Sequence, residues 1–155
     1  GISCAGYPEG HPNVIKKVEE GQKLTDSEMA RRVNVKGVWH VCSDADFVGE
    51  IAYLKAKVDA GADVIITQLF YDVDVFLAFV KACRDAGIQA PILPGIMPVV
   101  SYGGFSRMTT FCKTRVPEAL AARLEEVKAD AKAVKALGIE YGSELCKKLL
   151  ASGVV

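Results

Sequence analysis

Three short segments of this sequence have the residue types to bind a ligand, and each follows an apolar stretch typical of a β-strand. They are Gly6–His11, Gln68–Tyr71 and Pro94–Pro98. In parallel α/β sheets, ligands bind beyond the carboxyl ends of the strands, so a site is expected there. None of the three contains a nucleophile beside a base, a glycine-rich phosphate loop, a dinucleotide fingerprint or a metal-ligand cluster. Their neutral hydrogen-bonding groups and flat side chains suit an extended organic ligand better than a hydrolytic reaction.

Gln68 is the most distinctive single residue, because a carboxamide at the end of an apolar strand loses its hydration unless another group pairs with it. Its partner is either the backbone of a neighbouring loop or the edge of a bound heterocycle, and its position alone leaves both open. Tyr7 and His11 lie in a turn stiffened by Pro8 and Pro12. For His11, composition alone favours a structural role in that turn.

Three polar residues, Glu50, Tyr53 and Lys57, are spaced at i, i+3 and i+7 in a predicted helix, which places them on one face. A solvated face is the ordinary interpretation of such a pattern. Lys57 also suits the negative end of the helix dipole. The opposite face of the same helix is apolar and consists of Phe47, Ile51, Leu54 and Val58.

Strands alternate with helices along the chain, which is the pattern of an α/β fold with a parallel sheet. Val64 and Ile92, which begin two predicted strands, lie 28 residues apart. This spacing is close to the roughly 30 residues per unit of an eightfold β/α barrel. The predicted strands are 2–6, 64–67 and 92–97, and the predicted helices are 43–60, 74–86, 101–111, 117–128 and 130–152.

Three parallel strands do not close a barrel, and as an open sheet they leave two long edges. The chain is therefore either a small open α/β domain or a piece of a barrel, and we favour the second. Its start supports this, because it opens without methionine on a strand-like segment, as if cut from something larger. We expect a (β/α)8 TIM barrel of which this chain supplies roughly the second half.

Residues 13–42 do not fit the regular alternation. Positions 14–36 hold ten charges, six basic and four acidic, without a clean apolar stripe, which predicts a solvated loop with one short helix starting at Thr25–Glu28. Residues 37–42 alternate like a strand, either in the core or at the edge of an insertion. We therefore expect residues 1–155 to form part of one barrel domain with a surface insertion at about 13–42.

The charge balance and the cysteines narrow the class of protein. The chain has 19 basic and 19 acidic residues, so no positive surplus favours nucleic acid or an anionic membrane. The longest uncharged run, Ala86–Ser106, contains three prolines and would not span a bilayer as a regular helix. Five scattered cysteines without a CxxC pair predict reduced thiols and a cytoplasmic protein.

Four motifs in register, 5–12, 54–63, 66–70 and 94–98, closely resemble methylenetetrahydrofolate reductase. The resemblance covers nearly the whole chain apart from residues 13–42. It implies an eightfold β/α barrel whose FAD takes hydride from NAD(P)H and reduces 5,10-methylenetetrahydrofolate to 5-methyltetrahydrofolate. It further implies a small-molecule folate substrate and a homo-oligomeric intact enzyme.

Carried over position by position, the resemblance assigns the pterin-binding glutamine to Gln68. The family's FAD contacts fall on Tyr7, His11, Glu50, Tyr53 and Lys57. No catalytic residue and no metal ligand falls in this chain, because the family's catalytic glutamate belongs to the amino-terminal half. The chain alone is therefore expected to be inactive.

Two departures from the family pattern lie in the segment after the third strand. Gly104 stands where bacterial members have a folate-binding glutamine, and Met108 stands where they have a nearby aromatic residue. The insertion, with Trp39 and His40, is expected on the barrel surface near the adenine of FAD or a partner subunit.

Two other functions fit the sequence less well. A flavin-free barrel lyase or aldolase would need lysine or carboxylate at the strand ends, where this chain has Gln68 and Pro94. A non-enzymatic module would use the charged helix face between Lys113 and Lys135 for assembly, but its mixed charges favour ordinary solvation.

Overall fold

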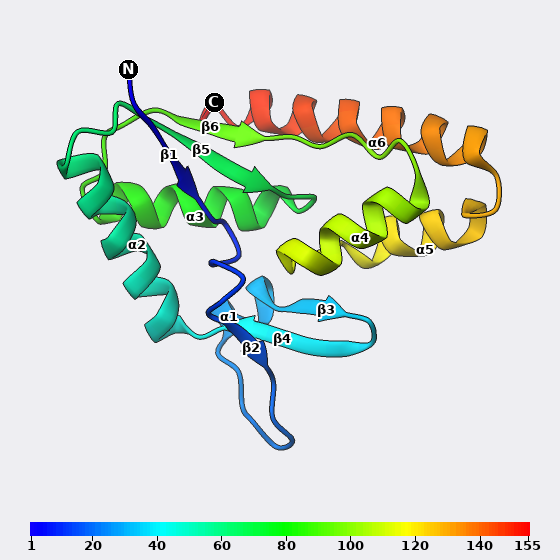
Figure 1. The fold of residues 1–155 in the computed structure, drawn as a ribbon, viewed down its shortest axis with the longest axis horizontal. Helices are drawn as coiled ribbons and strands as arrows, with labels where there is room; N and C mark the ends of the chain where they lie inside the picture. The colour runs from blue at the N-terminus through cyan, green and yellow to red at the C-terminus, as the bar shows by residue number, and fades with distance from the viewer.

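Two separate three-stranded sheets organise the chain in a computed structural model, which describes residues 1–155 (Figure 1). The first sheet is parallel, and its central strand pairs on either side in register, Ala5 with Ile66 and Ile65 with Ile92. The predicted α/β fold with a parallel sheet is confirmed. The order of its strands is β1 (Ser3–Gly6), β5 (Val64–Leu69) and β6 (Ile92–Gly95).

Helices α2 (Asp44–Asp59) and α3 (Val73–Asp85) connect these strands as the periodicity predicts. Ser43 caps α2 by accepting a hydrogen bond from the Asp46 backbone, and Asp72 caps α3 in the same way. Both caps use short polar side chains to satisfy amide groups that a helix start leaves free. The inward residues of α3 form the main core with β5 and β6: Phe76, Phe79, Val80 and Cys83.

The parallel sheet is covered by helices on one face only. Along β5, the side chains of Ile65 and Thr67 are buried, whereas Ile66 between them is 47% exposed. Leu93 on β6 is 50% exposed. Strands β1 and β6 each pair only with β5, so both edges of the sheet are free. The second face of the sheet is therefore open and partly apolar, and its three strands do not close a barrel.

Residues 13–42 form more structure than predicted. Thr25 is the N-cap of helix α1 (Asp26–Arg31), as expected, and it forms a reciprocal capping box with Glu28. The prediction of a solvated loop around it was wrong, because the segment also forms an antiparallel sheet. Strands 15–17 and 33–35 were missed since three residues are too few to show alternation. The sheet has the order β2 (Ile15–Lys17), β4 (Val38–Cys42) and β3 (Val33–Val35).

Strand β4 lies in neither of the two predicted places. It is the central strand of this second sheet, rather than a core strand of the parallel sheet or an edge strand. The second sheet lies at the end of the molecule away from both termini (Figure 1). Ile15 on β2 and Val33 on β3 are buried, and their burial explains how a charged segment still gains apolar packing.

The carboxyl-terminal third is helical, as predicted. Gly138 on the last helix packs so tightly that an added Cβ would lie 1.9 Å from the carbonyl oxygen of Val99. Gly142, one turn further along the same helix, has no such contact, since nothing lies within 4 Å of its Cβ position. No helix in the chain has both the length and the apolar character needed to cross a membrane. The helices are α4 (Tyr102–Cys112), α5 (Glu118–Val127) and α6 (Ala131–Ala151).

Candidate functional site

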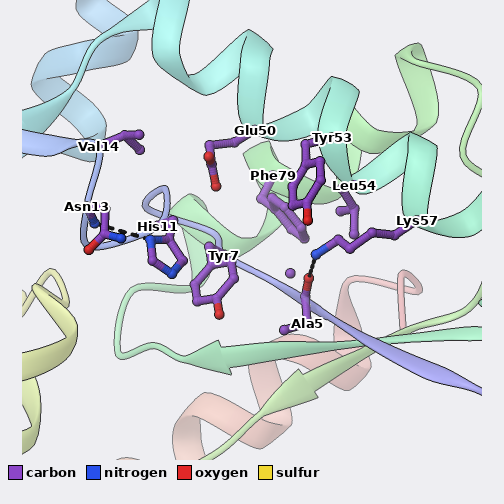
Figure 2. A pocket seen from close by; sticks show the side chains of 11 residues that line it. Ala5, Tyr7, His11, Asn13, Val14, Glu50, Tyr53, Leu54, Lys57 and Phe79 are labelled. Atoms are coloured by element: carbon purple, nitrogen blue, oxygen red, sulfur yellow. Dashed lines mark hydrogen bonds between the residues drawn. The ribbon is translucent and has the colours of Figure 1, made fainter.

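A pocket of about 270 Å³ lies between helix α2 and the turn that follows β1 (Figure 2). Eleven residues line it, and its position beyond the end of a parallel strand is where ligands of α/β folds bind. Five of the six site residues predicted from the sequence are among them. They are Tyr7, His11, Glu50, Tyr53 and Lys57.

Helix α2 contributes three of these side chains from a single face (Figure 2). The spacing of Glu50, Tyr53 and Lys57 therefore predicted their common face correctly. This face does not simply meet bulk solvent, because the turn after β1 lies opposite and closes a pocket against it. The Tyr53 ring is 64% exposed and carries the Lys57 ammonium 5.2 Å from its centre.

Lys57 ties the last turn of α2 to strand β1. Its Nζ donates a hydrogen bond of 2.6 Å to the carbonyl oxygen of Ala5 (Figure 2). An ammonium group has three donors, so this bond leaves two for another acceptor. Lys57 can therefore position the pocket wall and bind an anionic or carbonyl group at the same time.

The turn after β1 presents two rings to the pocket. Tyr7 and His11 meet edge to face with their centres 4.7 Å apart. The backbone N–H of Asn13 donates to Nδ1 of His11 at 3.2 Å. Because Nδ1 accepts, a neutral imidazole carries its proton on Nε2, which is then a donor for a ligand. The structural role favoured for His11 is thus compatible with a binding role.

Gln68 does not line this pocket. Its Oε1 accepts a hydrogen bond of 2.9 Å from the backbone N–H of Leu69, so the oxygen pairs with the next residue of its own strand and not with a neighbouring loop. Its amide nitrogen makes no hydrogen bond within the chain. Gln68 follows Ile66 by two residues on β5 and therefore shares the open face of the sheet with it. The side-chain nitrogen remains available to a ligand on that face.

Sequence reasoning missed several parts of this site. Asn13, Val14 and Phe79 also line the pocket, and Phe79 belongs to the main core as well. Glu9 was quoted within the first motif but given no role, and it is 4% exposed. Burial raises the pKa of its carboxyl from 4.5 to about 8. The signal available was a single carboxylate inside a turn of prolines and glycines, which does not reveal burial.

The fold and the pocket define a class: a β/α domain with a pocket at the carboxyl end of a parallel strand. A model of the family described as "Methylenetetrahydrofolate reductase" matches residues 1–155. The chain belongs to the methylenetetrahydrofolate reductase family.

Individual relatives agree with this assignment. The chain is 49% identical over 154 residues to a probable methylenetetrahydrofolate reductase (NADH) of Oryza sativa subsp. japonica, and equally similar to methylenetetrahydrofolate reductase (NADH) 1 of Arabidopsis thaliana. It is 35% identical over 153 residues to the 5,10-methylenetetrahydrofolate reductase of Salmonella typhimurium. These alignments cover 99% of the chain, but only 22% of each plant relative and 42% of the bacterial one. The chain thus spans about a fifth of the length of its plant relatives.

Proposed function

We propose that residues 1–155 form part of the catalytic domain of an enzyme that reduces 5,10-methylenetetrahydrofolate to 5-methyltetrahydrofolate, using FAD and NAD(P)H. Family membership and the names of the relatives, which specify NADH or NADPH, support the reaction. The observation that carries the proposal is that five residues assigned to FAD on motif similarity line one pocket. Motifs separated by more than 30 residues would not meet in this way by local structure alone.

The pocket residues fit one part of a flavin dinucleotide. Tyr7 and Tyr53 supply flat surfaces, Lys57 and His11 supply donors, and Glu50 supplies an acceptor suited to hydroxyl groups. A pocket of about 270 Å³ lies below the range of roughly 300–1,000 Å³ for complete ligand sites, so it holds only part of such a cofactor. When bound, the flavin supplies the hydride chemistry, and the residues of this chain bind and orient it.

We further propose that the open sheet belongs to a (β/α)8 barrel. Its unpaired edges at β1 and β6 and its exposed Ile66 and Leu93 require neighbouring strands, and a closed barrel supplies them. In such a barrel Gln68 lies near the rim with its amide nitrogen free for a pterin. The second sheet, in residues 13–42, is then an insertion outside the barrel.

We also propose that the complete enzyme is cytoplasmic and homo-oligomeric. All five cysteines are free thiols, which supports a reducing compartment. The oligomer rests on the family alone.

Replacing Lys57 by methionine tests the cofactor assignment. Removing a charge-assisted hydrogen bond to the cofactor is expected to raise the Kd for FAD about tenfold. The measurement is titration of the complete apo-reductase with FAD, followed by flavin fluorescence.

The matched control is Lys55→Met on the same helix. Lys55 pairs with Asp59 at 2.8 Å and does not line the pocket, so its loss should leave the Kd unchanged. A purified enzyme without a flavin absorption spectrum, or equal affinities in the two variants, would contradict the assignment.

A further inference from the structure

The turn that carries Tyr7 and His11 is supported from behind by the connection between α4 and α5, residues 113–117. The carboxyl of Glu9, at the centre of the turn, does not line the pocket and is buried on the other side. There its Oε1 accepts a hydrogen bond of 3.2 Å from the backbone N–H of Arg115. Lys113 holds the following segment, because its Nζ donates to the carbonyl oxygens of Pro12 at 2.7 Å and Ile15 at 2.6 Å.

Arg115 joins three parts of the fold at this point. Its backbone N–H binds Glu9, its Nε donates to Asp72 at 2.8 Å, and its Nη1 donates to the carbonyl oxygen of Arg32 at 3.0 Å. Asp72 is the N-cap of α3 and follows the β5 strand that carries Gln68. One residue therefore connects the turn at the pocket, the start of α3 after β5, and the junction between α1 and β3.

Burial favours the neutral form of Glu9 and outweighs the groups that face it. Asp72 from the start of α3 raises the pKa of Glu9, whereas the backbone N–H and the guanidinium of Arg115 lower it. The pKa of Glu9 is raised to about 8, chiefly by burial. At pH 7 the side chain is therefore mostly a neutral acid, for which glutamine is a close substitute in shape and hydrogen bonding.

We propose that Glu9 is a positioning residue for the cofactor: by binding the Arg115 backbone, it holds the Tyr7–His11 turn in the conformation that FAD requires. This inference rests on the proposed function of the pocket. Glu9 itself touches neither the pocket nor a ligand, and it acts only through the turn. Its loss leaves the turn free to move, so FAD must order the turn on binding and binds more weakly.

Glu9→Ala and Glu9→Gln, made in the complete reductase, test this proposal, with Glu20→Ala at an exposed position as the control. Glu9→Ala is expected to raise the Kd for FAD about tenfold, while kcat at saturating FAD stays within about twofold. Glu9→Gln is expected to restore the affinity at pH 7. Amide hydrogen exchange of the apoenzyme should accelerate in residues 7–14 of Glu9→Ala, and not across the molecule as it would for a general loss of stability.

The pH dependence provides a second readout that does not require the alanine variant to fold. Because burial disfavours the ionised carboxyl of Glu9, its ionisation above the pKa of about 8 disfavours the ordered turn. FAD binding by the unsubstituted enzyme should therefore weaken about tenfold between pH 7 and 9. Glu9→Gln has no proton to lose and should show a flatter profile. Parallel profiles in the two proteins would overturn the proposal.

The remaining outcomes separate this proposal from the function of the pocket. Unchanged Kd and unchanged exchange in Glu9→Ala would overturn the positioning role while leaving FAD binding intact. An original enzyme that binds no FAD would refute the proposed function, and with it any role of Glu9 toward that cofactor. Exchange of residues 7–14 would then report only whether Glu9 orders the turn.

Discussion

Replacing Gly95 by alanine is expected to reduce the free energy of unfolding by about 3 kcal/mol, the upper part of the usual range for an overpacked core. An added Cβ would lie 2.1 Å from the carbonyl oxygen of Thr67, which is backbone and cannot rotate away. Gly95 also donates its backbone N–H to Oγ1 of Thr67 at 2.9 Å. The clash would therefore separate β6 from β5 just where β5 reaches Gln68. The measurement is the midpoint of urea denaturation of the complete reductase.

Gly103→Ala is the matched control for this substitution. Gly103 lies in the first turn of α4, and nothing lies within 4 Å of its Cβ position. Alanine there should leave stability unchanged or increase it by up to about 1 kcal/mol, because it favours the helix. If the two variants were equally stable, the close approach of β6 to β5 would not exist as described.

Replacing Gln68 by alanine is expected to slow reduction of the folate about 30-fold, while reduction of the flavin by NAD(P)H continues at its original rate. In the proposed site the free amide nitrogen of Gln68 binds the folate, and losing a hydrogen bond to a bound substrate costs about 1–3 kcal/mol, or roughly 5- to 150-fold in rate. Under the proposed function, only the folate half-reaction uses this group. Stopped-flow absorbance of the flavin measures the two half-reactions separately.

Gln89→Ala provides the comparison for Gln68→Ala. Gln89 is exposed in the loop between α3 and β6, at the opposite end of the parallel strands from Gln68. Both half-reactions should keep their rates in this variant. Equal losses in the two half-reactions of Gln68→Ala would count against a specific contact with the folate.

The parts of the site that the sequence predicted well are those governed by local geometry. Helical spacing determines which side chains share a face, so Glu50, Tyr53 and Lys57 were placed together before any tertiary structure was known. The same periodicity predicted α3, as residues 74–86. Strands β2 and β3, three residues each, give no such signal, and they were missed for that reason.

The role of Glu9 was not predictable in this way. Its partner Arg115 lies 106 positions further along the chain, and the contact uses the backbone of Arg115 rather than a recognisable side chain. For Gln68, the sequence indicated that the side-chain amide needs a hydrogen-bond partner, but it did not indicate which atoms supply it. Its oxygen is satisfied by the next residue, which no pattern in the sequence distinguishes from a ligand contact.

The unpaired edges of strands β1 and β6 affect how residues 1–155 behave when they are separated from the rest of the protein. Unpaired amide and carbonyl groups along a flat strand recruit strands from other molecules. In solution, copies of residues 1–155 would thus tend to self-associate through these borders as concentration rises. Neighbouring strands in a longer polypeptide would suppress this by occupying the same hydrogen-bonding positions.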